Sequence, residues 1–268
     1  MNLDVKKLLK PLEELLLEAG SAVMEIYGQD DFQVENKSDG SPLTLADRTA
    51  HELITDYLGR LTPDIPILSE ESAEIPWTER QHWLTLWLVD PLDGTKEFIK
   101  RNGEFTLNIA LIRNGKPVLG AVYAPVQKLL YIGCQGQGSY CVGRDKRQIL
   151  SGPTGSGDVI RLVASRSHMS LAVGDFHQSL LAAGLKCEVI GMGSSLKLCL
   201  VAEGVADVYP RFGPTMEWDT AAAQAVVENA GGRVLTLDKE PLIYNKPDLH
   251  NPWFLVCAGN ADWFAYVR

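Results

Sequence analysis

The stretch that most constrains this chain runs from residue 87 to residue 95 and reads Trp-Leu-Val-Asp-Pro-Leu-Asp-Gly-Thr. An apolar segment at 84–89 ends at Asp90, and Asp93 follows three residues later. The apolar run predicts a buried strand that carries Asp90 at its carboxyl end. The Gly-Thr pair then predicts the start of a helix, where free backbone N–H groups and the helix dipole favour an anion.

Two carboxylates beside an anion site are expected to conflict unless a cation lies between them. At about 4 Å and an effective dielectric constant of about 20, two unit charges repel by roughly 4 kcal/mol. A hard divalent ion with oxygen ligands removes this repulsion and also binds phosphate. The alternative is a loop whose aspartates merely cap a helix. The apolar strand, Pro91 and the Gly-Thr pair together favour the metal–phosphate interpretation.

The composition narrows the class of protein. With 268 residues, 46% hydrophobic and 22% charged, the chain can bury a full core as one large domain or two smaller ones. A net charge of −9 argues against a nucleic-acid polymer as partner but allows a small phosphorylated ligand when metal ions supply positive charge. Five scattered cysteines without a Cys-x-x-Cys pair predict reduced thiols in a cytoplasmic protein. No apolar run is long enough for a membrane span, and the N-terminus does not read as a signal peptide.

The first half of the chain predicts helices packed on a largely antiparallel sheet. Apolar residues at helical spacing predict a helix that begins at Pro11. Thr44 and Asp47 form a capping box, which predicts a second helix to about residue 61. The polar segment between the helices reads as a loop, and its Lys37 is expected to be a solvated surface lysine. Strands are predicted at 66–68, 84–89, 105–112, 117–123, 128–133 and 138–142, the third and fourth joined by an Asn-Gly turn.

The second half alternates between strands and helices, the pattern of an α/β unit. Residues 151–158 have the composition of a linker. We therefore expect an N-terminal α+β domain at 1–152 with the antiparallel sheet and the metal motif, and a C-terminal α/β domain at 153–268 with a substrate subsite. Strands are predicted at 159–164, 187–190, 206–209, 234–236 and 254–258, and helices at 171–183, 194–203, 219–230 and the C-terminus.

A second motif, Trp-Asp-Thr-Ala-Ala at 218–222, places Asp219 at the start of a helix of small residues. Taken alone, this aspartate complements the helix dipole. Together with Asp-Pro-Leu-Asp-Gly-Thr at 90–95, it resembles the paired signature of the inositol monophosphatase superfamily, Mg²⁺-dependent and Li⁺-sensitive phosphatases. Ser-Pro-x-Thr-x-x-Asp at 41–47 and the Glu-Glu pair at 70–71 are supporting matches. The resemblance runs from the first helix to past residue 240 and implies the α-β-α-β-α layered sandwich of the inositol monophosphatase and fructose-1,6-bisphosphatase type, with the active site between the halves.

Three further segments, at 96–106, 193–197 and 209–215, resemble one branch of this superfamily, the bacterial 3'(2'),5'-bisphosphate nucleotidases. The resemblance implies removal of the 3'-phosphate from adenosine 3',5'-bisphosphate to give AMP, a reaction linked to sulfate assimilation. It leaves open whether 3'-phosphoadenosine 5'-phosphosulfate is also a substrate. One alternative is an inositol monophosphatase or fructose-1,6-bisphosphatase. Another is a non-catalytic metal- or nucleotide-binding regulator, which the complete set of expected carboxylates disfavours.

The resemblance also implies roles for individual residues. It implies two or three Mg²⁺ ions and inhibition of the enzyme by Li⁺. The implied metal ligands are Glu70, Asp90, Asp93, Asp219 and the carbonyl group of Leu92. Asp47 and Thr95 are expected to orient the attacking water, and Glu70 is expected to help hold it. We expect the substrate to contact Leu92, Asp93, Gly94, Thr95, His168, Ser194, Lys197, Arg211 and Asp219. His168 is included because it lies just beyond a predicted strand, where it can reach a phosphate or a base.

The residues themselves support a second anion subsite. Ser194 and Lys197 are three apart at a predicted helix start, so both can face one ligand. Arg211 offers a bidentate donor. Each of these residues alone would read as a surface charge or a polar loop residue, and only the set favours substrate binding. We expect a small nucleotide bisphosphate as partner, a monomer or homodimer, and a cytoplasmic location, with peripheral attachment to the cytoplasmic face of the inner membrane left open.

Overall fold

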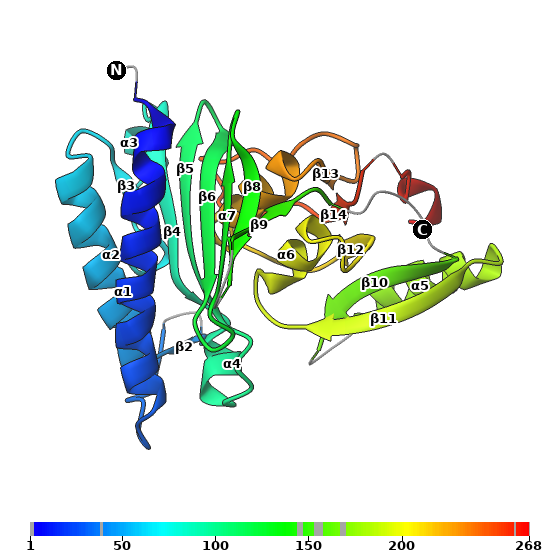
Figure 1. Ribbon diagram of the computed structural model, residues 1–268, viewed down its shortest axis with the longest axis horizontal. Coiled ribbons are helices and arrows are strands. Elements are labelled where there is room, and N and C mark those ends of the chain that lie inside the picture. Colours follow the sequence, from blue (N-terminus) through cyan, green and yellow to red (C-terminus); the bar gives the residue numbers. More distant parts are fainter. Residues whose placement is uncertain are drawn as a thin grey trace.

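The chain folds into five alternating layers of helices and sheets (Figure 1), and the computed structural model describes residues 3–37, 40–143, 147–152, 158–166, 170–259 and 261–267. Helices α1 and α2 cover the outer face of a seven-stranded sheet, and α7 covers its inner face. Beside α7 lies α6, which also contacts a five-stranded sheet, and α5 covers the far side of that sheet. The predicted α-β-α-β-α sandwich is therefore confirmed. The helices of these layers are α1 (Leu9–Tyr27), α2 (Leu45–Leu61), α5 (Leu171–Ala182), α6 (Leu196–Ala202) and α7 (Glu217–Asn229).

The seven-stranded sheet follows the chain order from β3 to β9. Only the first pair, β3 and β4, is parallel, and all later neighbours are antiparallel, as predicted. The Asn-Gly turn joins β5 and β6, and β9 is a strand that the sequence did not predict. The strands are β3 (Ile67–Ser69), β4 (Thr85–Asp93), β5 (Thr106–Arg113), β6 (Lys116–Ala124), β7 (Leu129–Cys134), β8 (Gly138–Val142) and β9 (Arg147–Leu150).

The five-stranded sheet has the order β11-β10-β12-β14-β13. Strand β10 pairs in parallel with both neighbours, whereas β14 pairs antiparallel with β12 and β13. All five strands were predicted within about two residues at their ends. They are β10 (Val159–Ser165), β11 (Lys186–Met192), β12 (Val208–Arg211), β13 (Arg233–Thr236) and β14 (Phe254–Cys257).

Three helix starts differ from the prediction for local physical reasons. Helix α7 begins at Glu217, two residues before the predicted start, because the side chain of Asp219 accepts the N–H of Met216 and caps the helix there. Helix α1 begins at Leu9, not at Pro11, and follows the 3-10 helix η1 (Val5–Leu8). Proline is tolerated at this third position because the first N–H groups of a helix have no intrahelical acceptor. Helix α6 begins two residues late because Ser194 has a φ of +46°, outside the helical region.

Shorter elements complete the described chain. The predicted loop before α2 contains an antiparallel pair, β1 with β2, and the predicted C-terminal helix is the 3-10 turn η3. Among the described residues, no helix is long and apolar enough to cross a membrane. These elements are β1 (Glu35–Asn36), β2 (Pro42–Leu43), η2 (Glu70–Ser72), α3 (Trp77–Arg80), α4 (Thr95–Ile99) and η3 (Phe264–Tyr266).

Helix α7 packs very closely against the seven-stranded sheet, and glycines in the sheet make this approach feasible. A Cβ atom on Gly120 in β6 would overlap the carbonyl oxygen of Ala222, and one on Gly133 in β7 would overlap that of Ala225. A helix from the second half therefore shares a core with strands of the first half, and buried residues of both halves form one cluster. The division at 152/153 stays a prediction, and 153–157 of the expected linker lie outside the described residues.

The close contact predicts a large loss of stability in Gly120→Val. The added side chain would push α7 off the sheet and lower the free energy of unfolding by about 3 kcal/mol or more. Urea unfolding followed by circular dichroism measures this loss. Gly59→Ala is the matched control, because nothing lies within 4 Å of the Cβ that it adds in helix α2. It should be neutral or stabilise by up to about 1 kcal/mol. Equal unfolding curves for Gly120→Val and the wild type would contradict the packing described here.

Candidate active site

A β-bulge near the end of β4 presents the two aspartates of the central motif. Asp90 pairs with Asn108 and Asp93 pairs with Thr106, so three steps along β4 match two steps along β5. The extra residue bends the strand. One carboxylate oxygen of Asp90 accepts the N–H of Leu92 at 3.1 Å. The strand was predicted to end at residue 89, and it extends to Asp93 because pairing resumes after the bulge.

The turn after β4 requires glycine. Gly94 has a φ of +92°, and a Cβ atom there would lie 3.3 Å from the carbonyl oxygen of Glu104. Helix α4 begins at the next residue, Thr95, as predicted. The predicted cradle for a phosphate at the N–H groups of Gly94 and Thr95 thus has the expected local geometry, and its role stays a prediction.

Asp47 and Thr95 come together from two different elements. The hydroxyl oxygen of Thr95 lies 3.0 Å from one carboxylate oxygen of Asp47 and 3.4 Å from the carbonyl oxygen of Leu92. The other carboxylate oxygen of Asp47 accepts the N–H of Thr44 at 2.7 Å, which confirms the capping box of α2. Burial raises the pKa of Asp47, and hydrogen bonds from Thr44 and Thr95 partly offset this increase. One carboxylate therefore both caps α2 and contacts the turn after β4.

Glu70 reaches the same region because β3 runs parallel to β4. Ser69 pairs with Val89, so Glu70 follows β3 beside the position where Asp90 follows Val89. The ammonium group of Lys37 lies 2.7 Å from Glu70 and 2.6 Å from Glu71. The expectation that Lys37 is solvated was wrong, since its side chain is only 19% exposed. Burial lowers the pKa of Lys37, but the two glutamates outweigh this effect and raise it.

Asp219 joins this group from the N-terminus of α7, where one of its oxygens accepts the N–H of Met216 at 2.9 Å. Burial raises the pKa of Asp219, and the negative charge of Asp93 raises it further. Burial likewise raises the pKa of Asp90, and the charges of Glu70, Asp93 and Asp219 add to the increase. Like charges shift each other in this way only at short range. Asp90 is fully buried and the other three acids are partly exposed. The four acids predicted to hold metal therefore share one region that needs positive charge.

A cavity of about 450 Å³ opens on this cluster, and Glu70, Asp93, Thr95 and Asp219 are among the residues that line it. Within the described ranges, no three histidine, cysteine or acidic side chains form a ready-made metal-binding group. In this structure Lys37 supplies positive charge at Glu70. Carboxylate and carbonyl oxygens are the ligands that Mg²⁺ prefers, so the donor set fits this ion. The assignment of individual ligands stays a prediction.

Lys197 and Arg211 line a second, smaller cavity of about 60 Å³ together with Asp93 and Asp219, and we call these two basic residues the basic wall. Lys197 is 8% exposed and donates to the carbonyl oxygen of Ser194 at 2.6 Å. Burial lowers its pKa to about 8, Asp93 opposes the decrease, and Arg211 adds to it. Arg211 donates to the carbonyl oxygen of Pro214 at 2.7 Å, and its buried Nε has no partner. A buried ammonium group beside a guanidinium group with an unused buried donor is suited to an anion.

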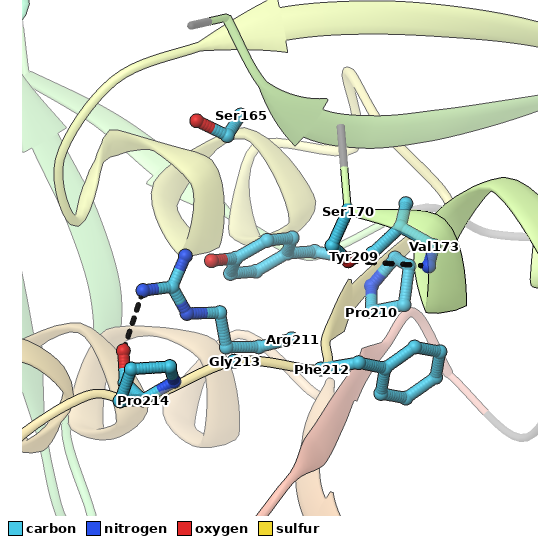
Figure 2. Close-up of a pocket in the computed structure, with 9 residues that line it drawn as sticks. All are labelled: Ser165, Ser170, Val173, Tyr209, Pro210, Arg211, Phe212, Gly213 and Pro214. Carbon is cyan, nitrogen blue, oxygen red and sulfur yellow. Dashed lines mark hydrogen bonds between the residues drawn. The ribbon is translucent and has the colours of Figure 1, made fainter. Parts of the chain in front are cut away.

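A third cavity, of about 140 Å³, adjoins the basic wall and is mostly apolar (Figure 2). Tyr209 and Arg211 line both cavities. Figure 2 shows the tyrosine hydroxyl and the guanidinium group pointing to the same side, away from Val173 and Pro210. The remaining lining residues are Ser165, Ser170, Phe212, Gly213 and Pro214.

Most of the predicted site residues are thus brought together in two groups, the acids on one side and Ser194, Lys197 and Arg211 on the other. His168 lies outside the described residues. The sequence did not single out His250, which lines the large cavity and whose Nδ1 lies 2.7 Å from Asp248. It also missed the hydrogen bond from the N–H of Ser195 to Asp93 at 2.5 Å. Ser195 lies in the segment 193–197 that the sequence singled out, but its hydrogen bond to Asp93 joins residues 102 positions apart, so only the fold reveals it.

The fold and the site define a class of protein, and comparison with known proteins agrees: this chain belongs to the Inositol monophosphatase family, whose sequence profile matches residues 4–258. The 3'(2'),5'-bisphosphate nucleotidase CysQ of Escherichia coli (strain K12) is 47% identical over 247 residues, 91% of this chain and 96% of that protein. The crystal structure of CysQ from Bacteroides thetaiotaomicron superposes with a TM-score of 0.82 and 46% identity, over 92% of this chain and 95% of that one. A lithium-soaked inhibitory complex of staphylococcal inositol monophosphatase-1, 21% identical, shares the fold with a TM-score of 0.80 and covers 100% of this chain and 95% of that one.

The crowding of carboxylates predicts how Asp93→Asn behaves. Burial raises the pKa of Asp93, so its ionised form costs stability in the metal-free protein. We expect the metal-free variant to melt no lower than the wild type, to gain less stability from Mg²⁺, and to lose about a hundredfold or more in turnover. Thermal melting with and without Mg²⁺ and a phosphate-release assay measure these effects. Turnover at the wild-type rate would remove Asp93 from the metal site.

Proposed function

We propose that this protein is a Mg²⁺-dependent 3'(2'),5'-bisphosphate nucleotidase, which removes the 3'-phosphate from adenosine 3',5'-bisphosphate and releases AMP. One observation carries the proposal: Asp93 and Asp219 line both the large acidic cavity and the small basic one. A ligand that fits this pair of cavities has one phosphate at the metal-binding acids and a second anionic group nearby. The name and the high coverage of the CysQ relatives support the same conclusion.

The third cavity supports a nucleotide over a simple sugar phosphate. It is lined by Arg211 and by apolar side chains such as Val173 and Phe212, and it shares Tyr209 and Arg211 with the small basic cavity. Ligand sites combine apolar walls with a few placed polar groups. We assign the cleaved phosphate to the acidic cavity, the second phosphate to Lys197 and Arg211, and the nucleoside to the space beside them.

The residues of the site have separate roles in the proposed reaction. Bound Mg²⁺ supplies Lewis-acid stabilisation of the phosphoryl group and lowers the pKa of the attacking water. Asp47 and Thr95 are placed to orient this water, and burial makes the Asp47 carboxylate a better proton acceptor. The N–H groups of Gly94 and Thr95 face the phosphate in this proposal. The holders of the metal are Glu70, Asp90, Asp93, Asp219 and the carbonyl group of Leu92.

The proposal also includes inhibition by Li⁺, a second substrate, the location of the protein and its oligomeric state. Li⁺ should inhibit the enzyme, 3'-phosphoadenosine 5'-phosphosulfate is a second candidate substrate, and the protein is expected to act in the cytoplasm as a monomer or homodimer. The N-terminal unit, 1–152, would provide most of the metal ligands, and the C-terminal unit, 153–268, would provide Asp219 and the second anion subsite.

A comparison of three substrates tests the proposed function. Phosphate release is measured from adenosine 3',5'-bisphosphate, inositol 1-phosphate and fructose 1,6-bisphosphate, with Mg²⁺, without Mg²⁺ and with added Li⁺. Since buried donors discriminate strongly against substrates that leave them unpaired, we expect kcat/KM for the nucleotide to exceed the others by about tenfold or more. Activity should require Mg²⁺ and fall with Li⁺. A preference for either sugar phosphate would favour the alternative phosphatases, and inactivity on all three would favour a regulator.

Lys197→Met tests the second anion subsite through both affinity and pH. Loss of a charge-assisted hydrogen bond should raise the KM for adenosine 3',5'-bisphosphate by about tenfold or more. Adenosine 3'-monophosphate, which lacks the second phosphate, should be affected little. Because the lowered pKa of Lys197 is about 8, the lysine is charged below this pH and neutral above it. In the wild type, kcat/KM for the bisphosphate should therefore fall above about pH 8, and this fall should be absent in the variant. An equal loss on both substrates would rule out the subsite.

A further inference from the structure

Glu104 touches both turns that build the site. Its carbonyl oxygen would lie 3.3 Å from a Cβ atom on Gly94, in the turn after β4, and 2.8 Å from one on Gly193, in the turn before α6. Both turns therefore need glycine where they meet the backbone of Glu104. This residue comes from the segment between α4 and β5, so it links the acidic half of the site to the basic half.

The carboxylate of Glu104 holds the second of these turns. One oxygen accepts the N–H of Gly193 at 2.8 Å and the Nε of Arg166 at 2.9 Å. The other oxygen lies 2.5 Å from Nη2 of Arg166. Glu104 itself is only 8% exposed, and its own N–H is held by Asn102 at 2.9 Å. The carboxylate is thus fixed from several sides and has one backbone group of the turn as its partner.

The conformation of the turn before α6 determines the position of the Lys197 ammonium group, which lines the small cavity. Ser194 has a φ of +46°, which is unfavourable for a residue with a side chain. Its carbonyl oxygen accepts from the ammonium group of Lys197 at 2.6 Å. The turn is anchored on one side by Glu104 at Gly193 and on the other by Asp93, which accepts the N–H of Ser195. Without the first anchor, Ser194 can relax, and the carbonyl group that holds Lys197 moves with it.

We propose that Glu104 is a positioning residue for the second anion subsite and that, without contacting the substrate, it sets the preference for a bisphosphate over a monophosphate. The inference rests on the proposed function, because it deepens the assignment of Lys197 to the second phosphate. A purely structural role for the Glu104–Arg166 ion pair would instead change stability and leave the preference intact.

Asp207 provides a matched control in the half of the protein that contains the Gly193 turn. Like Glu104, it is a buried carboxylate that accepts a backbone N–H, that of Arg161 at 2.7 Å, and pairs with the guanidinium group of that arginine at 2.8 Å. It is 6% exposed and does not line any of the three cavities described above. Asp207→Ala therefore removes a comparable set of interactions away from the turn.

The experiment measures kcat and KM for adenosine 3',5'-bisphosphate and adenosine 3'-monophosphate in the wild type, Glu104→Ala, Glu104→Gln and Asp207→Ala. In Glu104→Ala the ratio of the two kcat/KM values should fall by about fivefold or more, mainly through KM of the bisphosphate. Glu104→Gln retains an oxygen that can accept from Gly193, so its ratio should stay within about twofold of the wild type. Asp207→Ala should lose stability and keep the wild-type ratio. If Glu104→Ala does not fold, Glu104→Asp, whose shorter side chain withdraws the carboxylate from Gly193, replaces it.

The outcomes separate this inference from the proposed function. A wild type that does not prefer the bisphosphate would mean that the proposed function fails. A wild type that prefers it, together with an unchanged ratio in Glu104→Ala or Glu104→Asp, would overturn the role of Glu104 alone. A ratio that falls as far in Asp207→Ala as in Glu104→Ala would show that general loosening, and not the Gly193 anchor, is responsible.

Discussion

The active site depends on a group of acids that are withdrawn from water and repel one another. Burial disfavours the charged forms of Asp90, Asp93 and Asp219, and the negative charge of Glu70 makes ionisation of all three harder. A cluster of this kind is tolerated only when cations compensate it, and within the described structure Lys37 and Lys197 contribute some of this compensation. The same demand for positive charge makes the cluster suitable for Mg²⁺ and, through the metal, for a phosphate.

The rest of the fold holds these acids in place. Glu70 and Asp90 reach the site because β3 and β4 are parallel neighbours, and Asp93 is turned there by the bulge. Asp219 arrives on α7, which lies close to the seven-stranded sheet only because Gly120 and Gly133 leave room for its backbone. The position of the Asp219 carboxylate therefore depends on the tight packing of α7 against the sheet.

The basic side of the site has a different physical origin. Lys197 is buried beside the acids and Arg211 is partly buried, and both donate hydrogen bonds to carbonyl oxygens, those of Ser194 and Pro214. Among the described residues, neither forms an ion pair with a carboxylate, so both charges remain available to an anion in the small cavity. This arrangement is costly for a protein without a ligand and favourable for one that binds a second anion.

Local patterns in the sequence determined much of this protein. The alternation of apolar segments, the capping box at Thr44 and Asp47 and the Asn-Gly turn predict most elements. The two acidic motifs carry the family resemblance, which implied the layered fold and the four acids. What depends on distant contacts was missed or misplaced: the strand that continues past the bulge to Asp93, and the burial of Lys37 between Glu70 and Glu71. The contact of Glu104 with Gly193 joins residues 89 positions apart, and such a contact leaves no mark in local periodicity. Sequence periodicity reports which face of an element is buried, whereas only the tertiary structure decides which buried groups meet.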